Sequence, residues 1–202
     1  IKNGGLNGVY LGDVNAEAHL DRPNKRIMIK GDIVDSTHHR VADIHGKVIP
    51  ADSLWSLDID CDSLNVSFSD FWTDGIISDP TGLGYGHLYL EGKKKDFLLV
   101  GKALIKNGSL TVPQTGVRYS FTDSIYLDST AIRFPYVELY DQFNNKGVFF
   151  GNVYHKSFNN WSYDLGARAN KLLVMDIPRD QQAFFYGKVF GKKGSSKEWD
   201  AF

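Results

Sequence analysis

The feature that most constrains the fold of this chain is an alternation of apolar and polar residues with a period of two. Successive side chains of a β-strand point to opposite faces, so this alternation predicts strands with one apolar and one polar face. Such strands favour an antiparallel sheet with a single apolar side over a parallel sheet buried on both. The pattern recurs at 26–30, 55–62, 117–122, 137–139 and 163–169.

Turn residues separate these strands. Lys106-Asn107-Gly108-Ser109 predicts a tight hairpin, because asparagine and glycine accept the positive φ angles of such a turn. A second polar turn at 144–147 connects 137–139 with the next apolar run. The glycines of 82–86 lead into a strand, so we expect them to relieve crowding at a bend or bulge.

Composition excludes several classes of protein. The chain has 202 residues, with 23 Lys and Arg against 24 Asp and Glu, so it lacks the basic excess of a nucleic-acid-binding protein. No apolar run approaches the roughly 20 residues of a membrane-spanning helix. The first residues include no starting Met and no signal peptide. We therefore expect a piece of a longer protein, with any membrane anchor outside this fragment.

One segment departs from the strand pattern. Its aromatic and aliphatic residues have helical spacing, which predicts one short helix near 68–78. A helix of about two turns is not stable alone, so its apolar side chains should dock on the apolar face of the sheet. These docking residues are Phe68, Phe71, Trp72 and Ile76.

The chain also contains an internal repeat. The stretch from Asp35 to Trp55 parallels the stretch from Asp141 to Trp161, both 106 residues apart (141 − 35 and 161 − 55). Repeat-like units therefore cover about 25–92 and 132–191. Repeats of this kind indicate an elongated sheet in which each unit buries its apolar face against its neighbours.

The sequence predicts no catalytic, cofactor-binding or metal-binding residues. Three aspartates at 58, 60 and 62 resemble the start of a calcium loop but lack the glycine and glutamate that should follow, so we interpret them as a solvated strand face. The six histidines have no metal-binding spacing. Cys61 has no neighbouring histidine to activate it. We therefore do not expect an enzyme, although acidic residues that converge in a cleft could still form one.

The large apolar surface on one side of the strands can be removed from water in two ways. A second sheet could cover it and form a closed sandwich, or the sheet could curve into an open hydrophobic trough that accepts acyl chains. The residues predicted to line the trough are Ile27, Ile29, Leu57, Ile59, Val117, Tyr119, Phe121, Ile125, Leu127, Val137, Leu139, Tyr163, Leu165 and Ala167.

Several segments resemble one known family. The runs KGV (146–148), GNV (151–153), WSYDL (161–165) and FYGKV (185–189), together with 71–92, are similar to the C-terminal region of TamB-type proteins of the AsmA-like superfamily, especially the Bacteroidetes form. The similarity covers about 25–192 and consists of short strand patterns. It implies an all-β fold: an elongated, mainly antiparallel, curved sheet that forms an open trough, also called a β-taco.

The resemblance also implies a function. Family members are large periplasmic proteins of the cell envelope, anchored in the inner membrane, that reach an outer-membrane barrel protein of the Omp85 type. They act in outer-membrane biogenesis, in phospholipid transport or barrel-protein assembly, without catalytic residues or cofactors. Our leading hypothesis is thus a non-enzymatic carrier of phospholipid acyl chains between the two membranes. The alternative is a chaperone-like module that assists barrel or autotransporter assembly by β-augmentation.

Overall fold

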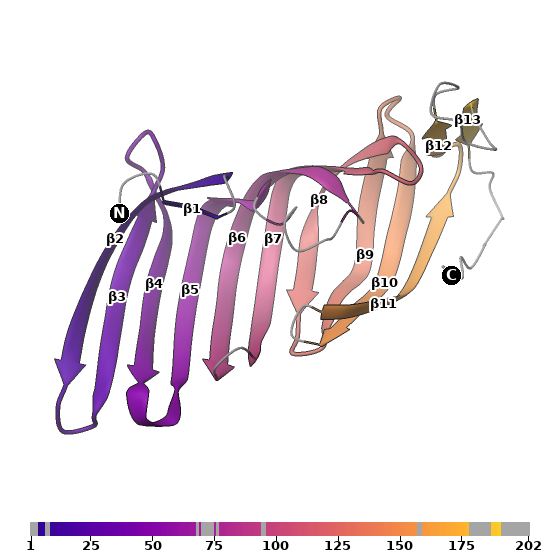
Figure 1. Cartoon of the computed structure of the whole chain (residues 1–202). Coiled ribbons are helices and arrows are strands. Elements are labelled where there is room, and N and C mark those ends of the chain that lie inside the picture. Colours follow the sequence, from indigo (N-terminus) through magenta and orange to yellow (C-terminus); the bar gives the residue numbers. More distant parts are fainter. Residues whose placement is uncertain are drawn as a thin grey trace.

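The main element of the protein is one antiparallel sheet of eleven strands, ordered β1 to β11 along the chain (Figure 1). The computed structural model describes residues 4–6, 9–67, 69, 75, 77–93, 96–156, 159–177 and 187–190. The sheet is not closed, because β1 and β11 lie at its two ends and do not pair. Its strands are β1 (Gly4–Leu6), β2 (Val9–Asp21), β3 (Arg26–Val34), β4 (Arg40–Ile49), β5 (Leu54–Asn65), β6 (Ser78–Lys93), β7 (Asp96–Val112), β8 (Val117–Leu127), β9 (Ala131–Asp141), β10 (Lys146–Lys156) and β11 (Asn159–Ala169).

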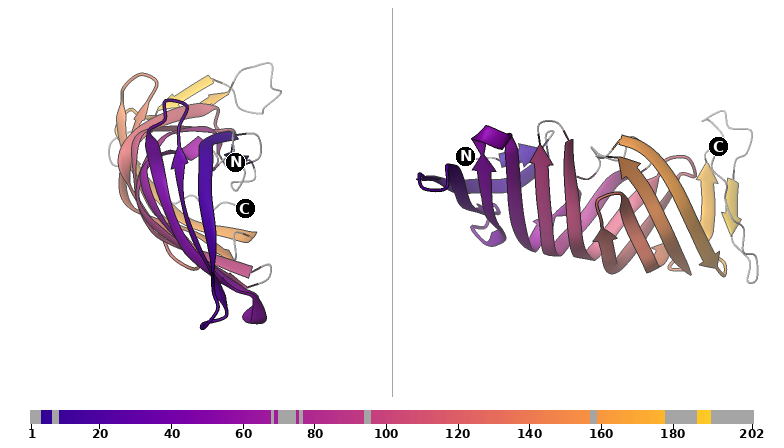
Figure 2. Two further views of the ribbon diagram at one scale, coloured as in Figure 1. Left: turned by 90° about the vertical axis from the view of Figure 1, so that its left-hand side faces the viewer. Right: turned by 90° about the horizontal axis from the view of Figure 1, so that it is seen from below.

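The remaining elements are small. One 3-10 turn, η1 (Pro50–Asp52), connects β4 to β5, and β12 (Leu173–Ile177) pairs with β13 (Gly187–Phe190) in a two-stranded sheet. Within the described part of the chain the only other sheet is the short pair β12 and β13, which is too small to cover the eleven strands, so these residues do not form the closed sandwich. The all-β, antiparallel architecture expected from the alternation is confirmed, and so is the elongated, curved sheet expected from the repeat and the resemblance (Figure 2).

The predicted hairpin at Lys106–Ser109 is wrong. These residues lie inside β7, which continues to Val112. The ladder with β8 shifts between Ile105, opposite Asp123, and Gly108, opposite Phe121, so the two residues between them form a bulge. Asn107 does adopt the expected positive φ of 51°. A left-handed residue suits a bulge as well as a turn, and the pairing with a neighbouring strand decides between them.

Two glycines of β6 and β7 lie where the neighbouring strand leaves no room for a side chain. A Cβ atom at Gly86 would lie 2.1 Å from the carbonyl oxygen of Lys102, and one at Gly101 would lie 2.2 Å from that of His87. Both glycines have positive φ, 142° and 150°, which disfavours any residue with a side chain. The expectation that the 82–86 glycines relieve crowding is therefore confirmed at Gly86, in a sheet that Figure 2 shows bent into an arc.

The predicted helix near 68–78 is largely outside the described residues, as are all four of its docking side chains, Phe68, Phe71, Trp72 and Ile76. Of its neighbourhood, Val66 and Ser67 begin a 3-10 turn directly after β5. None of the described helices is long and apolar enough to span a membrane.

The internal repeat corresponds to two turns with the same geometry. Asp35 directly follows β3, and its Oδ1 accepts hydrogen bonds from the backbone N–H groups of Thr37 and His39. Asp141 ends β9, and its Oδ1 accepts hydrogen bonds from the N–H groups of Phe143 and Asn145. Each aspartate therefore satisfies two amides of its own turn, which explains why it recurs at this place in the sequence.

Candidate functional site

One face of the sheet carries an apolar row of residues that runs from β2 to β11. Cross-strand pairing connects one residue of each of these strands in a row, and no member of the row is charged. The row consists of Ala16, Gly31, Ile44, Ile59, Leu88, Gly101, Leu127, Ile132, Val153 and Tyr163. We call the side of the sheet that carries this row the apolar face.

The opposite side has a polar row one residue away. Its members are Asn15, Asp32, Asp43, Asp60, His87, Lys102, Tyr126, Arg133, Asn152 and Asp164. Neighbouring members interact: His87 Nδ1 lies 2.8 Å from Asp60 Oδ1, and Lys102 Nζ lies 5.2 Å from the centre of the Tyr126 ring. We call this side the polar face. If one strand shifted by one residue against its neighbour, its apolar side chains would move to the polar face. The burial of apolar side chains on one face therefore fixes the register of the strands.

The fourteen residues predicted to line the trough all lie on the apolar face. Ile59, Leu127 and Tyr163 are members of the cross-strand row, and the others follow from alternation along β3, β5, β8, β9 and β11. Val117 and Val137 are buried, Tyr163 and Ala167 are exposed, and the other ten are half-buried. Side chains in a closed core would be almost fully buried, so this face is only partly covered.

Part of the cover on the apolar face comes from β12, at one margin of the sheet. Leu173 of β12 is fully buried, as is Val117 of β8, and the hydroxyl of Tyr119 donates a hydrogen bond of 2.9 Å to the Leu173 carbonyl oxygen. Burial, together with the nearby Asp141 carboxylate, raises the pKa of Tyr119 to about 12. The phenol therefore keeps its proton and remains a donor to β12.

Figure 2 shows on which side of the bent sheet this cover lies. In the end-on view β12 and β13 are at the upper rim, toward the hollow of the arc. Since β12 packs on the apolar face, the apolar face lines the hollow and the polar face forms the outer, convex side. Glycines such as Gly31, Gly46 and Gly101 interrupt the apolar face, and their missing side chains leave room where a concave surface is most crowded.

The ladder between β8 and β9 is open in its middle, a feature that was not predicted from the sequence. These strands pair at Tyr119 with Asp141 and Ser120 with Tyr140, and pair again only at Tyr126 with Arg133 and Leu127 with Ile132. In the opening, Asp123 Oδ2 accepts a hydrogen bond of 3.4 Å from the Glu138 backbone N–H. The sequence does carry a signal, because Asp123 breaks the apolar alternation of β8 and Pro135 places a residue without N–H in β9.

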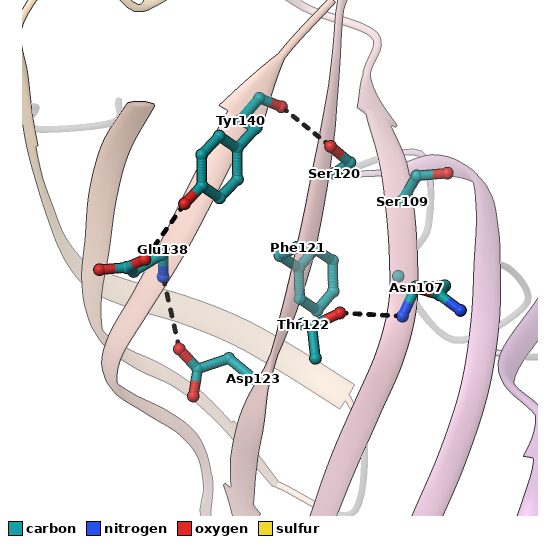
Figure 3. Close-up of a pocket in the computed structure, with 9 residues that line it drawn as sticks. Asn107, Ser109, Ser120, Phe121, Thr122, Asp123, Glu138 and Tyr140 are labelled. Atoms are coloured by element: carbon teal, nitrogen blue, oxygen red, sulfur yellow. Dashed lines mark hydrogen bonds between the residues drawn. The ribbon is translucent and has the colours of Figure 1, made fainter. Parts of the chain in front are cut away.

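A cavity of about 560 Å³ lies over this opening (Figure 3). Its polar-face lining comes from Ser109, Ser120, Thr122, Glu138 and Tyr140, and it also reaches Phe121 and Asp123. Lys146 Nζ lies 2.5 Å from Glu138 Oε1, and this hydrogen bond lowers the pKa of Glu138. The hydroxyl of Tyr140 donates to Glu138 Oε2 at 3.3 Å. Glu138 is thus an ionised acceptor at the rim of the cavity.

The side chains with nucleophilic or metal-binding chemistry form no further site among the described residues. No group of three or more His, Cys, Asp or Glu residues there could hold a metal ion. Cys61 lies on the apolar face, where burial, and then the charge of Asp60, raises the pKa of its thiol to about 11. At neutral pH this thiol is protonated and behaves as a small apolar side chain.

Comparisons with known proteins identify no relative. No protein-family model matches the chain, and neither does any curated protein or solved structure. Any function proposed for the chain therefore rests on its fold and on the arrangement of its two faces.

Proposed function

We propose that this chain carries hydrocarbon chains of phospholipids along its apolar face and catalyses no reaction. The observation that supports the proposal is the uninterrupted apolar row across ten strands, on a face whose side chains are mostly half-buried and not enclosed. The likeness of several segments to TamB-type proteins suggests the setting. There the chain would act in the periplasm, between the inner membrane and an outer-membrane barrel partner of the full-length protein.

The physical basis of the proposal is the burial of apolar surface. Half-buried side chains such as Ile29, Leu57 and Leu127 leave part of their area in contact with water. A bound acyl chain would remove that area from water and gain about 0.8 kcal/mol for each methylene it buries. Because the apolar row has no charged member, an acyl chain could shift from one strand to the next without meeting a desolvated charge.

Adjacent residues of β3 provide a matched test. Ile29 points to the apolar face and Met28 to the polar face, since Ile29 lies opposite Gly46 and Met28 lies opposite Lys47. We expect Ile29→Asp to remain folded but to bind the fluorescent acyl probe cis-parinaric acid about tenfold more weakly, because a charge now borders the hydrocarbon. Met28→Asp should bind the probe as the unchanged protein does.

Native mass spectrometry of the same proteins gives a second measurement. Phospholipid should copurify with the unchanged protein and with Met28→Asp, and much less with Ile29→Asp. Equal binding by both variants, or no lipid in any sample, would contradict the proposal. Unfolding of Ile29→Asp, judged by circular dichroism, would show instead that this part of the face is a closed core.

A second candidate function is favoured by the ends of the sheet. β11 is the last strand in the sheet order. Within the described part of the chain, no strand pairs with its outer edge. It has eleven residues and lacks the proline and lysine that often protect such edges. A client strand of a barrel protein could add to this edge by β-augmentation.

Crosslinking distinguishes the two functions. A photoreactive residue at Leu127, on the apolar face, should form adducts with phospholipid if the chain is a lipid carrier. A photoreactive residue at Ser162 of β11 should form adducts with unfolded barrel protein if the chain is a chaperone. If only the probe at Ser162 forms adducts, and only with peptide, the chaperone function is favoured over the lipid carrier.

A further inference from the structure

The polar face carries an exposed aromatic platform next to the cavity between β8 and β9. Tyr136 is 54% exposed, and its ring stacks on that of Phe150 with centroids 6.0 Å apart and planes 11° apart. Phe150 follows the same alternation as Asn152 of the polar row, so the stacked pair lies on the convex side. An exposed ring held parallel to a second ring presents a flat apolar surface to water.

The neighbouring strand is shaped to support this platform. A Cβ atom at Gly166 would lie 2.5 Å from the Phe150 ring, so only glycine allows that ring to lie flat across β11. The Arg168 guanidinium lies 5.4 Å from the Phe150 ring centre and borders the platform as a cation. Gly166 and Arg168 thus contact Phe150, and Phe150 in turn stacks against Tyr136.

The platform and the cavity are neighbours on β9. Tyr136 and Glu138 both project from the polar face of β9, two residues and therefore about 7 Å apart. Beyond Glu138, the cavity offers hydroxyl groups from Ser109, Ser120, Thr122 and Tyr140. A ligand that covers the aromatic rings would thus reach hydrogen-bonding groups with its next unit.

We infer that this surface of Tyr136, Phe150, Glu138, Tyr140 and Ser120 is a binding site for a neutral oligosaccharide. The apolar C–H face of a sugar ring matches the flat Tyr136–Phe150 platform. Its hydroxyl groups can donate to the Glu138 carboxylate and exchange hydrogen bonds with the serine, threonine and tyrosine hydroxyls.

Charge determines which kind of saccharide fits. The carboxylates of Asp123 and Glu138 line the cavity, while the Lys146 ammonium pairs with Glu138 and the Arg118 guanidinium donates to the lining residue Ser109. These opposite charges offset one another, so the surface offers paired charges and hydroxyl groups, which suit a neutral sugar unit better than a charged one. The site is on the convex face, opposite the proposed acyl-binding face, so the two can be tested independently.

The test measures binding of two neutral oligosaccharides, cellohexaose and chitohexaose, by isothermal titration calorimetry, with hyaluronan fragments as an anionic comparison. We expect at least one neutral oligosaccharide to bind and the anionic fragments not to bind. Tyr136→Ala should weaken binding about tenfold, the value of one aromatic stacking contact. Tyr136→Phe keeps the ring and should bind as the unchanged protein does, and Glu138→Gln should weaken binding.

A matched control lies on the other face of the sheet. Tyr163 is also an exposed tyrosine, at 45%, but it belongs to the apolar face. Tyr163→Ala should therefore leave saccharide binding unchanged. The inference is overturned if neither neutral oligosaccharide binds at concentrations up to about 10 mM, if hyaluronan binds as well as they do, or if Tyr136→Ala and Tyr163→Ala have equal effects.

Discussion

The Asp141 carboxylate accepts a hydrogen bond of 2.7 Å from the backbone N–H of Leu173 while it also caps its own turn. Asp35 caps the equivalent turn in the first repeat through its Oδ1. Its Oδ2 has no such backbone partner among the described residues. The two aspartates thus have the same local role, but only Asp141 connects the sheet to the strand that covers the margin of its apolar face.

This difference predicts unequal effects of the same substitution. Asp141→Ala should lower the free energy of unfolding by about 2 kcal/mol, because the buried N–H of Leu173 and two amides of the turn lose their acceptor. Asp35→Ala should lower the free energy of unfolding by clearly less, because only turn amides near solvent lose their acceptor. Urea unfolding of both variants measures the two losses, and equal losses would show that the contact with β12 adds nothing.

The same contact predicts a dependence on pH. Burial of Asp141 favours its neutral form, but hydrogen bonds from Asn145, Leu173 and Phe143 outweigh it and hold its pKa below the ordinary value. A lowered folded-state pKa gives stability that is complete above about pH 4 and is lost as the pH falls through the folded value. The unfolding free energy should therefore fall below about pH 4, and it should fall less steeply in Asp141→Asn. Identical pH profiles would contradict this.

The close approach of β6 and β7 predicts a strong effect at Gly86. Gly86→Ala should destabilise the protein by about 2–3 kcal/mol, because the new methyl group would meet the Lys102 carbonyl and the positive φ would be strained. Gly75 has a φ of 77° and no atom within 4 Å of where a Cβ would lie, so it is a control in which only the backbone is strained. Thermal unfolding of Gly75→Ala should show a loss of about 1 kcal/mol.

The raised pKa of the Cys61 thiol predicts that this side chain reacts slowly with alkylating reagents. With a thiol pKa of about 11, roughly one molecule in a thousand carries the thiolate at pH 8. Alkylation of the folded protein by iodoacetamide should therefore be slow and should accelerate when urea unfolds the chain. Mass spectrometry measures the fraction modified with time, and rapid modification without urea would show that this part of the apolar face opens easily.

Several elements could be predicted from the sequence because they depend on local chemistry. The alternation of three apolar residues with three aspartates in 57–62 already separates the two faces of β5, and the repeat already places Asp35 and Asp141 at equivalent positions. The hairpin at 106–109 could not be predicted correctly. Asn107 has the same backbone conformation in a turn and in a bulge, and only the ladder between β7 and β8 distinguishes them.

The same distinction applies to the two candidate sites. The fourteen residues of the apolar face could be selected from alternation, because the side on which a residue lies depends only on its position along one strand. The saccharide surface could not, because Tyr136, Phe150 and Arg168 come from three strands whose relative register the sequence does not state. Asp123 and Pro135 did mark the opening between β8 and β9 as irregularities.

The order of residues along the chain was enough to establish two-faced strands in an antiparallel sheet, because side-chain direction along a strand has a fixed period of two. It was not enough to establish that the sheet stays open, that β12 covers one margin of its apolar face, or that a cavity opens between β8 and β9. These features depend on contacts between residues far apart in the chain, such as Asp141 with Leu173, whose free energies no local pattern encodes.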